Sequence, residues 1–111
     1  IKESAGRLLT VDGAVKKAGA FTAIGPMALM QAVAMAGGLS DEANPRRVAI
    51  FRTIDGQRQA AAFDLVSIRR GEMHDPRVYA GDIAVIDGTT LSPIQKQVLQ
   101  SLPILSIFRP L

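Results

Sequence analysis

Few residues in this chain have the types and spacing that chemistry requires. The one histidine, His74, lies beside Asp75-Pro76 with no cysteine to help it hold a metal ion. Asp12, Asp64 and Asp82 each fit a turn or a helix cap, and no two carboxylates, and no nucleophile and base, stand at a recognisable spacing. We therefore predict no catalytic residue, no metal site and no cofactor, and a protein that is not an enzyme.

The densest clusters of charged residues in the sequence consist of arginines. Arg46, Arg47 and Arg52 form one basic cluster near the edge of a predicted sheet, and Arg69-Arg70 is another. A solvated face that protects an edge strand explains such a cluster, and contact with an anionic partner is the alternative. The net charge is only +3, with one Tyr, four Phe and no Trp. Without a recognisable DNA- or RNA-reading module, we predict no nucleic-acid partner.

Composition indicates one domain with a modest core, because 48% of the 111 residues are hydrophobic. The lack of cysteine excludes a thiolate zinc site and a disulfide framework, and it leaves the compartment open. The sequence has no initiating Met, no signal-peptide pattern and no apolar run near the ~20 residues of a membrane helix. We expect a piece of a longer protein whose targeting segment lies upstream.

The stretch from Gly25 to Ser40 predicts one complete helix. Pro26 suits the first helical position, and Gly37 suits the left-handed residue that ends a helix. One face has the spacing of a core stripe: Ala28, Leu29, Ala32, Val33 and Ala36. The other face carries a single polar side chain: Met27, Met30, Gln31, Ala34 and Met35. A surface helix normally has more polar residues, so this methionine face is expected to be covered, either by the chain's own C-terminal segment or by another subunit.

A hairpin is predicted before this helix. Residues 9–15 alternate like a half-buried strand, and Ala20 to Ala23 returns beside them with Phe21 inward. Gly13 within the first strand indicates a bulge or a close backbone approach.

A second hairpin follows a polar loop over residues 41–45. Its strands, 47–53 and 58–63, meet at the strong turn signal Asp55-Gly56. Asp64 is expected to cap a short helical turn that Gly71 ends. Residues 83–86 are an apolar run suited to a buried central strand.

The C-terminal segment has its own start signal. Ser92-Pro93-Ile94-Gln95 is a capping-box pattern, and Pro103 should end the resulting helix near Leu102. The residues that follow are unusually apolar for a chain terminus.

The order of elements is hairpin, helix, hairpin, helical turn and final strand. It predicts an α+β fold of the β-grasp type, a mixed sheet of four to five strands around one main helix, with a C-terminal helical segment. A ferredoxin-like fold is the alternative, but it needs a longer second helix than residues 64–70 allow. We divide the chain into a linker or end of a preceding domain (1–7), the β-grasp domain (8–88) and the C-terminal segment (89–111).

Spaced residues across residues 9–86 resemble one family. They are Val11-x-Gly13-x-Val15-x-x-Ala18-Gly19-x-Phe21, then Leu29, Ala32 and Ala36-Gly37-Gly38-Leu39, then Phe51-Arg52, Asp64-Leu65, Gly71 and Gly81-Asp82-Ile83-x-Val85. The series resembles the SLBB domain, the soluble-ligand-binding β-grasp, of Wza-type polysaccharide export proteins of the Gram-negative outer membrane. Its structural motif residues are Gly13, Gly19, Gly37, Gly38, Gly81 and Asp82. The family usually has Pro-Gly where this chain has Ala18-Gly19.

The resemblance implies a non-catalytic assembly module of a capsule or exopolysaccharide export channel, in the periplasm or at the outer membrane. The implied partners are a homo-oligomeric ring, the exported polysaccharide and an inner-membrane polysaccharide co-polymerase. Members of the family often end in an amphipathic helix, which the resemblance relates to an outer-membrane contact. Pro93 to Leu111 is short for a span of ~30 Å, so this segment is expected either to lie on the outer membrane or to dock on a neighbouring subunit. A module that binds a specific sugar or another small soluble ligand is the alternative function.

Two sets of site residues follow. Arg46, Arg47 and Arg52 are candidates for contact with an anionic glycan or with acidic groups of the next subunit. The candidate subunit interface comprises Met27, Met30, Met35, Leu105 and Phe108.

Overall fold

The structure of the chain is a computed structural model, and it describes residues 8–23, 25–89, 91–102, 104 and 108–110. Three helices are present in this part of the chain: α2 (Leu29–Met35), α3 (Leu65–Arg69) and α4 (Pro93–Ser101). The strands are β1 (Leu8–Gly13), β2 (Gly19–Thr22), β3 (Met27–Ala28), β4 (Ala43–Ile54), β5 (Gln57–Phe63), β6 (Arg77–Val78), β7 (Ile83–Gly88) and β8 (Arg109–Pro110).

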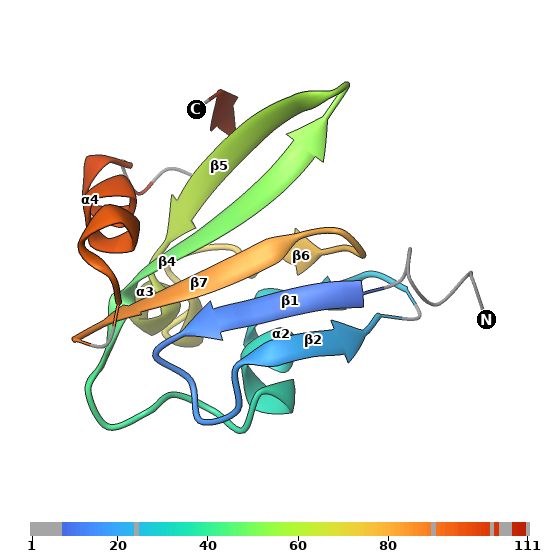
Figure 1. Cartoon of the computed structure of the whole chain (residues 1–111). Helices are drawn as coiled ribbons and strands as arrows, with labels where there is room; N and C mark the ends of the chain where they lie inside the picture. The colour runs from blue at the N-terminus through green and yellow to red at the C-terminus, as the bar shows by residue number, and fades with distance from the viewer. Residues whose placement is uncertain (1–7, 24, 90, 103, 105–107, 111) are drawn as a thin grey trace.

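Six of the strands form a mixed sheet in the order β2-β1-β7-β4-β5-β8, and β3 and β6 form a separate pair. The adjacent strands β1 and β7 run parallel, whereas all other neighbouring strands of this sheet pair antiparallel. Figure 1 shows this sheet with α2 and α3 behind it, and with α4 beside the ends of β4 and β5. The predicted α+β fold of the β-grasp type is confirmed, and the two-residue β8 adds a sixth strand at one edge.

Each face of the sheet has its own hydrophobic core, because side chains alternate along a strand. On the face that we call the α2 face, buried residues such as Leu9, Ile50 and Phe63 pack with residues of α2 and α3. On the opposite α4 face, small residues such as Ala60 and Ala62 allow α4 to pack closely through Leu99. The apolar run of β7 is thus covered on both sides. None of the helices in the described part of the chain has the length and hydrophobicity to span a bilayer.

The start of α2 differs from the prediction. Residues Met27 and Ala28 pair with Val78 and Arg77 as strands, so the helix begins at Leu29 and Pro26 does not hold its first position. Ala28 has no side chain that can cap the helix. The loop before β6 takes this role, since the Leu29 N–H donates to the Pro76 carbonyl at 2.9 Å and the Met30 N–H donates to Asp75 Oδ1 at 3.4 Å. No local sequence pattern encodes a cap that comes from residues so far along the chain.

The end of α2 is as predicted. Gly37 has a φ of +83°, and its N–H donates to the carbonyl of Ala34 while the N–H of Gly38 donates to that of Val33. These are the two hydrogen bonds of a Schellman motif. Four residues of the predicted core stripe are buried, Leu29, Ala32, Val33 and Ala36, whereas the fifth, Ala28, is half-buried in β3.

The second hairpin and the C-terminal helix form at the predicted signals. Asp55 and Gly56 both have positive φ and join β4 to β5. Ser92 accepts from the N–H of Gln95, and the Gln95 side chain accepts from the N–H of Ser92, which completes the capping box of α4. One predicted boundary is wrong: Ala43 and Asn44, placed in a loop, already pair with β7 as the first residues of β4.

Candidate functional site

An irregularity in the pairing of β4 with β7 contains two of the predicted basic residues, Arg46 and Arg47. Asn44 pairs with Asp87 and Val48 pairs with Ile86, so the three residues between them, Pro45, Arg46 and Arg47, have no partner on β7. Proline has no N–H to give to a sheet, and a bulge is a position where it is tolerated. The two neighbouring arginines in this bulge, Arg46 and Arg47, reach opposite faces of the sheet.

Arg46 reaches α3 on the α2 face. Its Nη1 lies 3.1 Å from Oδ2 of Asp64, which is the N-cap of α3 and accepts the N–H groups of Val66 and Ser67 at 2.9 and 3.2 Å. Burial acts to raise the pKa of Asp64, but the backbone N–H groups of Ser67 and Val66 and the Arg46 guanidinium outweigh it, so the pKa lies below 3.8. The Arg46 side chain remains 56% exposed, so the ion pair leaves much of it in contact with solvent.

We predict that Asp64→Ala lowers the free energy of unfolding by about 1 kcal/mol at pH 7, the usual effect of losing an N-cap. The pKa of Asp64 is lower in the folded protein than in the unfolded chain. Its electrostatic contribution to the free energy of unfolding is therefore complete above its ordinary pKa of 3.8, and it is lost as the pH falls through the folded-state pKa. Urea unfolding between pH 7 and pH 3 should therefore show the difference between Asp64→Ala and the parent shrinking at the acid end. A difference that grows on acidification contradicts the assignment.

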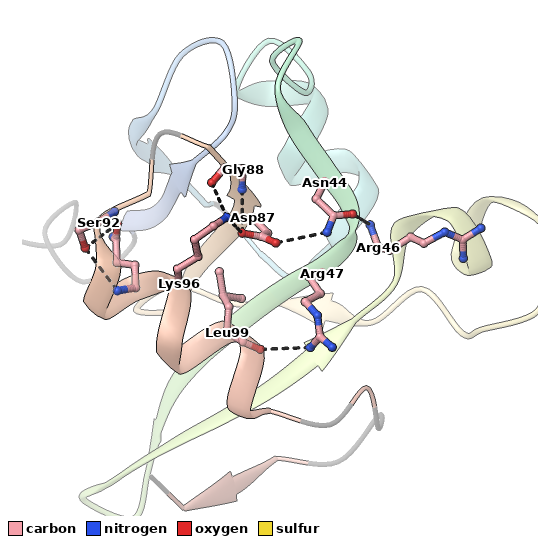
Figure 2. Close-up of polar contacts among 9 residues, drawn as sticks. Asn44, Arg46, Arg47, Asp87, Gly88, Ser92, Lys96 and Leu99 are labelled. Carbon is pink, nitrogen blue, oxygen red and sulfur yellow. Dashed lines mark hydrogen bonds and ion pairs between the residues drawn. The ribbon is translucent and has the colours of Figure 1, made fainter.

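Arg47 and Lys96 hold α4 on the α4 face. Arg47 Nη1 donates to the carbonyls of Leu99 and Leu102, both at 3.3 Å, at the helix end where a cation is favourable. Lys96 Nζ lies 3.1 Å from Oδ1 of the buried Asp87, whose Oδ2 accepts from Asn44 at 3.2 Å. Figure 2 shows these contacts joining the bulge in β4, the end of β7 and the inner side of α4.

Arg52 is the centre of a third cluster, on the α2 face. Its Nε and Nη2 donate to both carboxylate oxygens of Asp82 over 2.8–3.2 Å, and Nη2 also donates to the carbonyl of Arg77. The guanidinium carbon lies 4.9 Å from the ring centre of Tyr79 and 4.3 Å from that of Phe108. Asp82 is 2% exposed and also accepts the N–H of Tyr79. The Arg52 guanidinium thus connects β4, the turn before β7 and Phe108, which lies near the C-terminus.

The predicted glycan or subunit contacts Arg46, Arg47 and Arg52 are not brought together on one surface. Each has a partner of its own within the chain: Asp64, the end of α4 and Asp82. Their contact with a glycan or a neighbouring subunit stays a prediction.

The predicted subunit interface is also divided. Met27 and Met30 are half-buried and pack against the core of the α2 face, whereas Met35 packs against neither core of the described residues. Phe108 lies against the α2-face core and under Arg52, and Leu105 lies outside the described residues. The described C-terminal helix covers the face of the sheet opposite α2. Within the predicted interface, Met35 is therefore the residue best placed for an external contact.

The motif glycines and Asp82 have structural roles. Gly13 has a φ of +87° and passes so close to β7 that a Cβ atom would lie 2.3 Å from the carbonyl oxygen of Ile86. Gly81, with a φ of +92°, turns the chain toward β7, and its N–H donates to the carbonyl of Leu8. Gly19 is the first residue of β2. These positions fix how β1, β2 and β7 meet.

A groove on the α4 face is a concave feature that the sequence did not reveal. It has a volume of about 340 Å³ and lies between the N-terminal half of α4 and the uncovered part of the sheet. Its lining is mostly apolar and includes Phe51, Ile83 and Val98, and the polar residues along it are Asp12, Arg58 and Gln95. The alternation of β4, β5 and β7 places the sheet residues on this face, but the sequence alone does not show which part α4 leaves open. Within the described residues, no three His, Asp or Glu side chains gather as a possible metal site.

Comparison with known families assigns the first half of the fold. Residues 8–62 match the family model of the SLBB domain, which covers β1 to β5 up to the penultimate residue of that strand. A search of curated proteins finds no match to the chain.

Proposed function

Since this chain is a member of the SLBB domain family through its residues 8–62, we propose that it is a non-catalytic assembly module of a polysaccharide export channel. The proposed location is the periplasm, at the outer membrane. The proposed partners are further copies of the chain in a ring, the exported polysaccharide and an inner-membrane co-polymerase. The domains of the proposal are the β-grasp unit of residues 8–88 and the C-terminal segment of residues 89–111, which is a candidate for the outer-membrane contact.

The family match is the observation that carries this proposal. The geometry of the chain is consistent with a rigid building block. Its sheet is packed on both faces. The ion pairs Arg46–Asp64 and Arg52–Asp82 join parts of the chain that are distant in sequence, and the ion pair Lys96–Asp87 joins α4 to β7. A rigid domain of this kind suits an assembly in which subunits pack together without a conformational change.

Met35 is the proposed subunit contact. It is the last residue of α2 and is half-buried, although it belongs to neither core of the described residues. Its neighbour Ala34 is exposed and apolar. A flexible thioether next to a small residue suits a packed interface between subunits.

We predict that Met35→Asp reduces assembly of the full-length protein, because a charge in a desolvated interface has no partner. Mass photometry in detergent should show the ratio of ring species to smaller species falling by at least about tenfold. This change corresponds to a loss of ~1.4 kcal/mol in the free energy of association. Gln100→Asp is the matched control, since it places the same charge in the last turn of α4, at an exposed position across the sheet. Circular dichroism checks that both variants fold. A Met35→Asp protein that assembles as the control does contradicts the proposed interface.

A ligand-binding module is the second candidate function, and the groove on the α4 face favours it. A site for a small molecule is typically concave and mostly apolar, with a few polar groups that orient the ligand. The floor and the polar residues of this groove have that character. A passive conduit should show no saturable site in calorimetry with short glycans, whereas a ligand-binding module should show one.

A further inference from the structure

The floor of the groove is a row of apolar side chains on the α4 face of two adjacent strands, β4 and β7. Ile83 of β7 pairs with Phe51 of β4, and Val85 lies two residues further on the same face. Phe51 and Ile83 are only half-buried, because α4 packs over the neighbouring alanines and stops short of them. The result is an apolar groove floor with one aromatic ring, open to solvent.

Three polar side chains with unused hydrogen-bonding capacity line this floor. Asp12 of β1 uses Oδ1 to accept the N–H of Gly13, and its Oδ2 has no partner among the described residues. Arg58 of β5 is exposed and makes no hydrogen bond or ion pair within the part of the chain that the structure describes. Gln95 of α4 is oriented by the capping box through its Oε1, which leaves its amide nitrogen to donate. A carboxylate, a guanidinium and an amide thus come from three different elements.

These groups have the chemistry that a sugar requires. A pyranose ring has one face of C–H groups, which packs on an apolar or aromatic surface, and a rim of hydroxyls, each of which can donate and accept. Planar side chains with two hydrogen-bonding atoms can bridge adjacent hydroxyls. The volume of about 340 Å³ lies at the lower end of the range for small-molecule sites and suits roughly one to two sugar rings.

We propose that this groove binds a short stretch of glycan, with a sugar ring on Phe51 and its hydroxyls bonded to Asp12, Arg58 and Gln95. The proposal rests on the ligand-binding function put forward above and names its site and ligand class. An ionic ligand is disfavoured because Asp12 and Arg58 have opposite charges. A purely apolar ligand would leave these three polar groups without partners.

The test is a titration of the full chain with three probes: the trisaccharides of glucose, of N-acetylglucosamine and of glucuronic acid. Backbone amide NMR shifts report the site, and calorimetry reports the affinity. We expect saturable binding of at least one probe, at roughly millimolar Kd, with the largest shifts at residues of the groove. Arg58→Ala and Asp12→Asn should each weaken that binding by about tenfold, as expected for loss of a hydrogen bond to a charged group.

Arg69→Ala is the matched control for Arg58→Ala, because it removes an exposed arginine of α3, which packs on the opposite face of the sheet. It should leave the affinity unchanged. Phe51→Ala should abolish binding, but Phe51 also packs against Leu99 and its neighbours, so the two polar variants keep the test independent of folding. Binding that none of the groove variants weakens, or no saturable binding of any probe, overturns the proposal.

The same samples separate this proposal from the assembly function. Mass photometry of the full-length protein with Arg58→Ala should show the parent's oligomeric state. An intact assembly without sugar binding overturns the groove site alone, and leaves the proposed assembly function standing. Saturable sugar binding in a protein that never assembles supports the groove site and overturns the assembly function.

Discussion

Replacing Arg52 by alanine is expected to lower the free energy of unfolding by about 3 kcal/mol. The substitution leaves the Asp82 carboxylate, which is 3% exposed, without the guanidinium that donates to both of its oxygens. Removal of one partner from a buried ion pair typically costs 3–5 kcal/mol, and the lower end applies because the Arg52 side chain is 22% exposed. The loss of the contacts with Tyr79 and Phe108 adds to the same effect.

Urea unfolding of three variants checks this expectation. Arg52→Lys retains the charge but loses the planar fork, so its effect should lie between those of Arg52→Ala and the parent. Arg58→Ala removes an exposed arginine without a described partner and should change stability by no more than about 0.5 kcal/mol. The double variant Arg52→Ala with Asp82→Ala should be more stable than the sum of the single effects predicts, since no uncompensated charge remains. If Arg52→Ala lies within about 0.5 kcal/mol of the parent, the ion pair does not stabilise the fold.

The parts of the fold that sequence predicted are those whose causes lie within a few residues. The Asp55-Gly56 turn, the Asp64 cap and the Ser92–Gln95 capping box all form where their local patterns placed them. Each depends on side chains and backbone groups that are neighbours in the chain. The β-grasp order could be predicted because it follows from the sequence of such elements.

The parts that sequence did not predict depend on residues brought together from afar. The N-terminus of α2 is capped by Pro76 and Asp75, and the bulge in β4 exists because Asn44 and Val48 pair with consecutive residues of β7. Neither pairing leaves a local pattern. The residue type of Pro26 predicts a place in the first turn of the helix, but pairing of the next two residues with β6 determines the structure instead.

The candidate site shows the same division. The basic residues stood out by type, but their partners lie 18, 30 and 52 residues further along the chain for Arg46, Arg52 and Arg47. The groove consists of residues from β1, β4, β5, β7 and α4 and appears only when the helix has docked. Alternation along each strand could have placed Phe51, Arg58 and Val85 on one face, given the strand pairing. The position of α4 on that face had no counterpart in the sequence pattern.

Gly13→Ala is expected to lower the free energy of unfolding by at least about 3 kcal/mol, or to prevent folding. Two costs combine at this position. A φ of +87° disfavours any residue with a Cβ, by about 1–2 kcal/mol. In addition, the new methyl would lie 2.3 Å from the Ile86 carbonyl oxygen and 2.9 Å from its nitrogen, both of which are backbone atoms of the central strand. Relief of this clash requires β1 to move away from β7, at a further cost of about 1–3 kcal/mol.

Gly81→Ala separates the two costs. Gly81 has nearly the same φ, +92°, but a Cβ there meets no atom within 4 Å. Only the conformational cost of about 1–2 kcal/mol should apply, so thermal unfolding should place Gly81→Ala between the parent and Gly13→Ala. Equal destabilisation by the two substitutions would mean that the close approach of β1 to β7 adds nothing. The larger loss at Gly13 is expected because β1 and β7 are paired interior strands of the sheet, and a displacement between them disturbs the cores on both faces.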